Sequence, residues 1–234
     1  DTGSRGLGDV YKRQDITILF TLKCIVMNRL FFIVTHRYVA LFFFIFCCLG
    51  LNAVTFTVTN TNDDGYGSLR WAVDEADPGD DIAFDATLNG QTITLTTGEI
   101  TIGKDLVIDA TNLDSIIIDG NASDRIFRVD VGKTVTMDGL ILQNGSVSLQ
   151  IGGGLLNQGT TTLRNCMIRN CSTQSNGGGV ASYFGQKLTL IGCTVYGNSA
   201  GSDGGGIYAD DSLTLVNCTV NSNTSPTNGG GIYS

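Results

Sequence analysis

One sequence pattern recurs several times in this chain, and that repetition limits the possible folds more than any other feature. Three consecutive glycines recur at intervals of 25, 27 and 25 residues, in the runs Gly152–Gly154, Gly177–Gly179, Gly204–Gly206 and Gly229–Gly231. Between them a second pattern keeps the same period and reads "TMDGLILQNG", "TLRNCMIRNC", "TLIGCTVYGN" and "TLVNCTVNSN". Two independent landmarks that share one period identify a structural repeat.

The repeat has the chemistry of β-strands. Apolar residues in "KLTLIG" and "SLTLVN" alternate with polar ones, and glycine and asparagine separate the short runs. A helical repeat would instead place apolar residues at i, i+3 and i+4 over a dozen positions. Three short strands per period cannot pair within one repeat, so each pairs in parallel with its equivalent in the next, about 4.8 Å away. We therefore predict an all-β protein whose chain winds as a parallel β-helix.

Such a winding stacks equivalent residues into columns that face the core. Three columns are predicted: Leu140, Cys166, Cys193 and Cys218; Leu142, Ile168, Val195 and Val220; Leu155, Val180, Ile207 and Ile232. The glycine runs supply positive φ and close backbone approach where one strand bends into the next. For Asn198 and Asn223, two equivalent turn residues, we expect left-handed backbone geometry and side chains that bond to neighbouring coils.

A short helix is predicted before the first coil. Ser68 is a suitable N-cap, and Leu69, Ala72, Val73 and Ala76 fall on one face at helical spacing. A coil at the end of such a stack exposes its core and a strand edge, and a capping helix covers both. We assign residues 54–104 to this cap and the first strands, and residues 105–234 to the coils, with further coils expected after the last glycine run.

The N-terminal part of the chain is interpreted as a targeting segment. Arg29 and Arg37 precede a thirteen-residue apolar run, residues 39–51, which has the length of a signal-peptide core and is short for a membrane span. We read residues 27–53 as a signal peptide, with an uncleaved membrane anchor as the alternative. Residues 1–26, which include "DVYKRQ", share no pattern with the rest of the chain and are interpreted as a non-native leader. The protein is therefore expected to be exported.

Charge and histidine content exclude several kinds of function. Residues 54–234 hold eight of the 14 Lys and Arg residues and 19 of the 22 Asp and Glu residues. An acidic body without a basic stripe repels phosphate, so we expect no nucleic-acid partner. The only histidine, His36, lies before this region, which excludes Ser-His-Asp catalysis, Cys-His catalysis and His-ligated zinc from it.

The repeats resemble those of a known group of proteins. The "GGGI" turns with the "CTVYGN" lines are similar to the repeats of polymorphic outer membrane proteins and related right-handed parallel β-helix surface proteins of bacteria. The opening "FTVTNTNDDGYGSLRWAVDEA" is similar to the N-terminal cap of large secreted β-helix proteins of that kind. The resemblance covers residues 56–234. It implies a cell-surface, outer-membrane or extracellular scaffold for adhesion or recognition. Its partner would be a host or neighbouring-cell surface component or a polysaccharide, and any membrane contact would run through a C-terminal anchor beyond this sequence.

One outward column carries candidate catalytic residues. Asp138 aligns with Arg164, and Asp109 lies one coil earlier. Two carboxylates roughly 5 Å apart beside an arginine are the groups that glycoside hydrolysis or calcium-assisted lyase chemistry uses. The structural alternative is a surface ladder with one ion pair between coils. A polysaccharide lyase or glycoside hydrolase is thus the alternative to a non-catalytic scaffold.

The cysteines have two readings. Stacked Cys166, Cys193 and Cys218 have Cα atoms about 4.8 Å apart, within reach of a disulfide. Their side chains point the same way, however, which opposes the required torsion and favours free buried thiols. Cys171 stands at a turn position outside that column.

Two further groups of residues are candidate ligand sites. Acidic turns at Asn62–Gly65, Gly79–Asp81 and Ala209–Asp211 offer oxygen ligands, which makes calcium the one candidate cofactor, although none has the spacing of a dedicated calcium loop. The outward tyrosines are candidates for stacking on sugar rings; they are Tyr183, Tyr196, Tyr208 and Tyr233. Tyr208 and Tyr233 occupy equivalent positions in successive coils and are expected to stack on each other.

Overall fold

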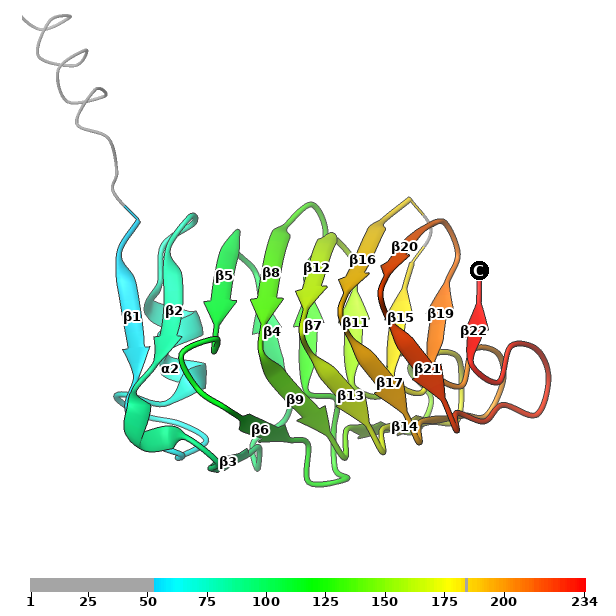
Figure 1. Ribbon diagram of the computed structural model, residues 1–234, viewed down its shortest axis with the longest axis horizontal. Coiled ribbons are helices and arrows are strands. Elements are labelled where there is room, and N and C mark those ends of the chain that lie inside the picture. Colours follow the sequence, from blue (N-terminus) through cyan, green and yellow to red (C-terminus); the bar gives the residue numbers. More distant parts are fainter. Residues whose placement is uncertain (1–52, 184) are drawn as a thin grey trace, which may run out of the picture. The chain divides into compact units, whose positions relative to one another are not determined.

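The computed structural model describes residues 53–183 and 185–234, and the leader and signal-peptide predictions for residues 1–52 lie outside this part of the chain. The described residues wind into coils that follow one another along the long axis (Figure 1). Every strand pair in them is parallel, and each strand pairs with its equivalent in the next coil. The predicted parallel β-helix is confirmed.

The coils build four parallel sheets, which we call sheets A to D. Sheet A contains β1 (Thr55–Val58), β2 (Asp81–Phe84), β5 (Leu106–Asp109), β8 (Thr134–Asp138), β12 (Thr160–Arg164), β16 (Lys187–Ile191) and β20 (Ser212–Val216). Sheet B contains β3 (Thr92–Thr94), β6 (Ile116–Asp119), β9 (Leu140–Gln143), β13 (Met167–Arg169), β17 (Thr194–Tyr196) and β21 (Thr219–Asn221). Sheet C contains β4 (Ile100–Ile102), β7 (Phe127–Val129), β11 (Leu155–Asn157), β15 (Val180–Ser182), β19 (Ile207–Ala209) and β22 (Ile232–Tyr233). The small sheet D contains β10 (Ser146–Val147), β14 (Ser172–Thr173) and β18 (Ser199–Ala200).

The register stacks like residues on like, as the repeat predicts. Leu142 pairs with Ile168, Ile168 with Val195, and Val195 with Val220. The column that follows the glycine runs is paired in the same way, from Leu155 to Ile232. Except at the last coil, where they are partly exposed, these side chains are buried in one continuous apolar core.

The turns are built from two sets of left-handed residues. Between sheets A and B they are Gly139, Asn165, Gly192 and Asn217, and between sheets B and D they are Asn144, Asn170, Gly197 and Ser222. The prediction of left-handed geometry for Asn198 and Asn223 is therefore wrong by one position. The preceding residue takes the positive φ, which turns the asparagine side chain into the coil.

The predicted bonding of these asparagines between coils is confirmed. The Asn198 side chain is 1 % exposed, and its Nδ2 donates to the Ile168 carbonyl and to Asn223 Oδ1, both at 3.0 Å. Its Oδ1 accepts from the Cys171 amide at 2.9 Å. A buried backbone group without a partner is costly, so these amides stabilise the turn from within the stack.

The triple glycines let successive coils approach closely. The first glycine of each run has a positive φ between 60° and 72°. A Cβ on the middle residue Gly178 would overlap the carbonyl oxygen of Gly205 in the next coil, and the same holds for Gly153 against Gly178. Any other residue at these positions would push two coils apart, which explains why the run recurs with the repeat.

The capping helix is α2 (Leu69–Glu75), and a short 3₁₀ turn, η1 (Ala86–Leu88), follows β2. Ser68 is the N-cap, and its hydroxyl accepts from the Trp71 amide at 3.1 Å. The predicted apolar face is buried, with Leu69, Ala72 and Val73 inside the core. In the part of the chain that the structure describes, no helix is long and apolar enough to cross a membrane.

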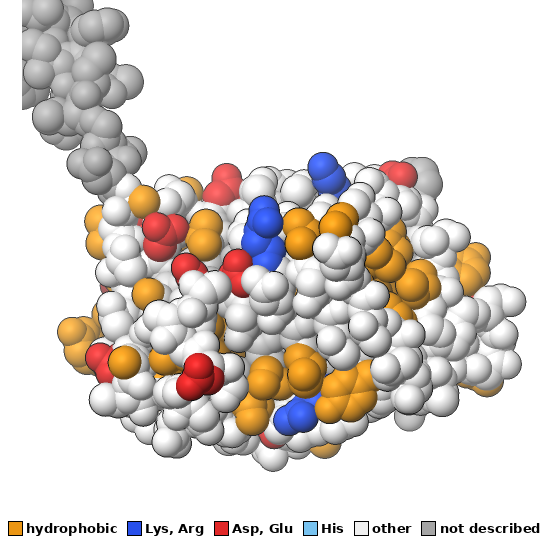
Figure 2. All heavy atoms as spheres, viewed as in Figure 1, with side chains coloured by type: hydrophobic (Ala, Val, Ile, Leu, Met, Phe, Trp, Pro, Cys, Tyr) orange, Lys and Arg blue, Asp and Glu red, His pale blue; other side chains and the backbone are white. Residues whose placement is uncertain are grey.

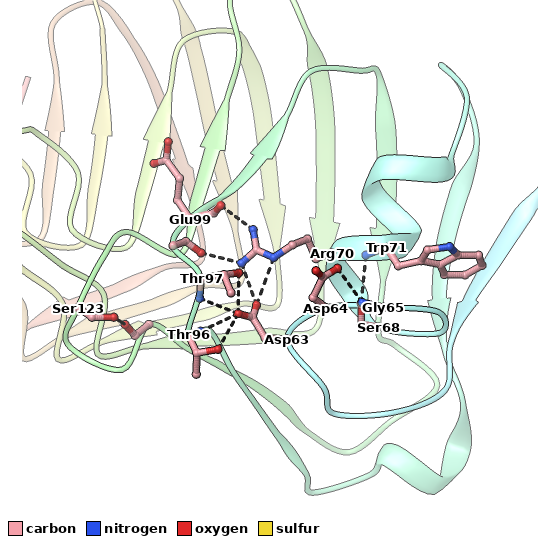
Figure 3. Close-up of polar contacts among 12 residues, drawn as sticks. Asp63, Asp64, Gly65, Ser68, Arg70, Trp71, Thr96, Thr97, Glu99 and Ser123 are labelled. Carbon is pink, nitrogen blue, oxygen red and sulfur yellow. Dashed lines mark hydrogen bonds and ion pairs between the residues drawn. The ribbon is translucent and has the colours of Figure 1, made fainter.

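A single carboxylate joins the cap to the first coil (Figure 3). Asp63 Oδ1 accepts from Arg70 Nη2 at 2.8 Å, and Asp63 Oδ2 accepts from the amides of Thr96 and Thr97 at 2.8 and 2.7 Å. Arg70 also donates to the backbone carbonyls of residues 98–99. Burial alone would raise the pKa of Asp63, but these donors hold it well below its usual range.

Candidate functional site

The candidate catalytic residues share one outward column of sheet A. Asp109 pairs with Asp138, and Asp138 with Arg164, at the ends of β5, β8 and β12, so the predicted alignment is confirmed. Among the described residues, however, no ion pair joins Asp138 to Arg164. Asp138 Oδ1 instead accepts from Asn165 Nδ2 at 3.0 Å, and Asp109 Oδ1 accepts from the Thr111 amide at 2.8 Å. Asp109 thus supports the turn that follows its own strand, and Asp138 supports the equivalent turn of the next coil.

A second outward column, on sheet B, forms a connected polar row. Register places Asp119, Gln143, Arg169, Tyr196 and Asn221 on successive strands, and we call these five residues the sheet B row. Sequence reasoning singled out only Tyr196 from this row. The other members could have been found by extending the repeat alignment to the last residue before each turn.

Hydrogen bonds hold the sheet B row in a fixed arrangement. Gln143 Nε2 donates to Asp119 Oδ2 at 2.7 Å, which directs Gln143 Oε1 toward Arg169. Arg169 donates to that oxygen from Nε at 2.9 Å and from Nη2 at 2.6 Å, and its Nη1 donates to the Tyr196 hydroxyl at 3.2 Å. The guanidinium is therefore oriented by two neutral side chains, and none of the ion pairs in residues 53–183 and 185–234 involves it.

An apolar column runs beside the sheet B row. Ile117, Ile141 and Met167 are paired in register two residues before Asp119, Gln143 and Arg169, and they are partly exposed. Figure 2 shows a basic side chain among hydrophobic ones on this face, over β9, β13 and β17. The surface here combines one cation, one tyrosine and a small apolar patch.

The charge along the chain changes at residue 139, just before β9. Residues 139–202 contain no Asp or Glu and carry Arg164, Arg169 and Lys187. Residues 54–138 contain 16 Asp and Glu residues and five Lys and Arg residues. Residues 139–202 therefore form a positively charged band between two acidic segments, residues 54–138 and 203–234.

A buried arginine, Arg125, lies two residues before strand β7 of sheet C. Arg125 is 1 % exposed and donates to Glu99 Oε2 at 2.5 Å, to Gln150 Oε1 at 2.8 Å and to the carbonyls of residues 151–152. Burial lowers the pKa of Arg125, and the charge of Glu99 opposes that shift. Because the side chain is buried and all three guanidinium nitrogens donate to protein oxygens, we assign Arg125 a structural role. It lies where the repeat is weak, and no sequence signal pointed to it.

The four cysteines in the part of the chain that the structure describes are free thiols, as the stacking argument favours. The Sγ atoms of Cys166, Cys193 and Cys218 donate to backbone carbonyls of the preceding coil, those of Met137, Leu163 and Leu190. The Cys193 thiol and burial raise the pKa of Cys166, and burial raises that of Cys171 to about 12. Cys166 and Cys171 therefore stay protonated at neutral pH and are poor nucleophiles, whereas the hydrogen bond with Cys166 lowers the pKa of Cys193.

The other candidate ligand residues mostly contact the protein itself. Tyr208 and Tyr233 stack with ring centroids 5.2 Å apart and planes inclined by 5°, as predicted. Of the acidic turns, Asp63 bonds to Arg70, and Asp80 accepts from the Val54 amide through Oδ1 and from the Asp77 amide through Oδ2. Across residues 53–183 and 185–234, no group of three or more His, Cys, Asp or Glu side chains is arranged to hold a metal ion.

Comparison with known proteins agrees with this architecture. A family model described as "Right handed beta helix region" matches residues 92–234, which is more than half of the chain. No curated protein matches the sequence. The in-register parallel coils and the family match together show that the chain belongs to the right-handed β-helix family.

Proposed function

We propose that this protein is an exported recognition scaffold, displayed at the cell surface or secreted, that binds a surface component or polysaccharide through the outer faces of its sheets. The observation that carries the proposal is the sheet B row, in which side chains from successive coils are fixed relative to one another by their own hydrogen bonds. A ligand that meets such a row finds its partners already ordered, which lowers the entropic cost of binding.

The resemblance to polymorphic outer membrane protein repeats supports the same role. The "GGGI" and "CTVYGN" lines that carry the resemblance form the turns and the strands of sheets B and C. In this proposal the core supplies rigidity and the outward rows supply recognition, so no chemistry is required of the interior.

The test uses the full chain and a panel of neutral and acidic polysaccharides, with both binding and turnover measured. We expect saturable binding to at least one member of the panel and no release of unsaturated or reducing ends. Absence of binding across the panel and to intact bacterial and host cells would contradict a recognition role.

A polysaccharide lyase or glycoside hydrolase is the second candidate function. The observation in its favour is the alignment of Asp109, Asp138 and Arg164 on adjacent strands of sheet A. The same panel separates the two functions, because turnover that is lost in Asp138→Ala would replace the scaffold proposal with an enzyme.

A further inference from the structure

We infer that the sheet B row and the apolar column beside it form a binding site for a carboxylate-bearing sugar unit, with Arg169 as the group that contacts the carboxylate. This inference rests on the proposed recognition function and assigns it a place and a ligand class. The site comprises Ile141, Gln143, Met167, Arg169 and Tyr196, from the neighbouring strands β9, β13 and β17.

The Arg169 guanidinium has N–H donors available for a ligand. It carries five N–H donors, of which three bond to Gln143 and Tyr196, and the remaining two have no acceptor among the described residues. The nearest carboxylate in the row, Asp119, is two strands away, or roughly 10 Å, and is held by Gln143 and Asn144. Physiological salt screens a charge at that distance, so Arg169 remains available to an anion.

The surroundings of that cation favour an anionic ligand. Residues 139–202 lack acidic side chains, so no neighbouring carboxylate in this band competes with a ligand anion. Ile141 and Met167 flank the row on one side, and the Tyr196 ring lies on the next strand. Partly apolar surroundings strengthen a charge-assisted hydrogen bond, and an arginine with two free N–H groups suits the planar carboxylate.

The paired backbone of this face favours a sugar over a peptide as the ligand. Peptides usually add to sheets through backbone hydrogen bonds at a free edge, but here the backbone of β13 is paired with β9 on one side and β17 on the other. The face therefore offers only side chains. A sugar ring supplies a C–H face for Met167 and Tyr196, hydroxyls for Gln143 and Tyr196, and a carboxylate for Arg169.

The test is isothermal titration calorimetry of the full chain with oligomers of glucuronic acid at physiological ionic strength. We expect binding, a loss of affinity of at least about tenfold in Arg169→Gln, and a loss of about threefold in Tyr196→Phe. The matched control is Lys187→Gln, which removes one positive charge from the same acid-free band on sheet A, and it should change affinity less than about twofold. Circular dichroism of each variant shows whether the coils remain folded, and Tyr196→Phe keeps the test usable if Arg169→Gln unfolds.

Several results would overturn the inference. Equal binding of the methyl-esterified oligomers would show that the carboxylate is not recognised, and equal binding of polyglutamate would show a peptide or general polyanion site. Equal losses in Arg169→Gln and Lys187→Gln would show unspecific attraction. No binding of the uronate oligomers, with binding of other members of the panel retained, would remove this site and leave the recognition function standing.

Discussion

The coils before residue 139 and those after it share one architecture but are held together by different chemistry. The earlier coils have a core of large aliphatic and aromatic side chains, such as Ile82, Phe84 and Phe127, and individual charged contacts secure them. The later coils repeat small residues, with stacked glycines joined by backbone bonds such as Gly153 N to Gly177 O at 3.1 Å. In the repeated coils the same coil-to-coil contacts recur at every turn, whereas each irregular coil is held by contacts that occur only there.

This difference predicts where single substitutions do most damage. In the earlier coils the sensitive residues are the members of buried charged pairs, since loss of one partner leaves the other charge uncompensated. In the later coils they are the glycines at coil-to-coil contacts, where added volume meets backbone.

The largest effect is expected for Glu99→Ala. The substitution leaves the buried Arg125 guanidinium without its carboxylate, and we expect the free energy of unfolding to fall by about 4 kcal/mol. Urea denaturation followed by circular dichroism measures this. Asp130→Ala is the control, because its ion pair with Arg128 is exposed and should contribute less than about 1 kcal/mol. Similar losses in both variants would show that Arg125 does not depend on Glu99.

The next largest effect is expected for Gly178→Ala. The added methyl group meets the carbonyl oxygens of Ser199 and Gly205, and we expect a loss of about 3 kcal/mol. Gly132→Ala is the control, since no atom lies near its missing Cβ and only the strain of its positive φ of 74° remains, so about 1 kcal/mol should be lost. The coil-contact explanation fails if the control is as unstable as Gly178→Ala.

A smaller, pH-dependent effect is expected for Asp63→Asn. At neutral pH the variant should be less stable by about 2 kcal/mol, because the charged carboxylate accepts from Arg70, Thr96 and Thr97. The pKa of Asp63 is lowered on folding, so its contribution is complete above the unfolded value near 4 and is lost as the pH falls through the folded value. The difference between wild type and variant should thus shrink below about pH 4. A difference that stays constant from pH 7 to pH 2 would contradict the role of the charged form.

The smallest effect on stability is expected for the cysteine column. Cys193→Ala removes the hydrogen bond from the Cys193 thiol to the Leu163 carbonyl and should lower the free energy of unfolding by about 1 kcal/mol. In the native protein Cys166 and Cys171 should resist iodoacetamide at pH 8, whereas partly exposed Cys218 should react. Peptide mapping by mass spectrometry reads each site separately, and rapid labelling of Cys171 would show that the coil around it is not closed.

The same division explains how much of the structure was predictable. The period of the glycine runs sufficed for the fold, the core columns and the Tyr208–Tyr233 stack, because a repeat in sequence becomes a repeat in space. Ser68 and the apolar face of α2 were predictable from local chemistry. The Glu99–Arg125 and Asp63–Arg70 pairs were not, since their partners lie in irregular coils where no period aligns them.

For the candidate sites, register was predictable and side-chain partners were not. The alignment of Asp109, Asp138 and Arg164 follows from the repeat, but the choice of Asn165 over Arg164 as the partner of Asp138 depends on the left-handed turn at Asn165. The sheet B row was overlooked because its members differ in type from coil to coil. Only their common position, directly before a turn, connects them.

The most direct test of the whole account is the position of the cysteine sulfurs, measured by anomalous X-ray diffraction from crystals of the protein. Stacked, in-register coils predict that the sulfurs of Cys166, Cys193 and Cys218 form a row along the long axis, separated by about one strand spacing of 4.8 Å. Sulfur positions scattered across the molecule, with no such row, would contradict the coiled architecture and every site derived from it.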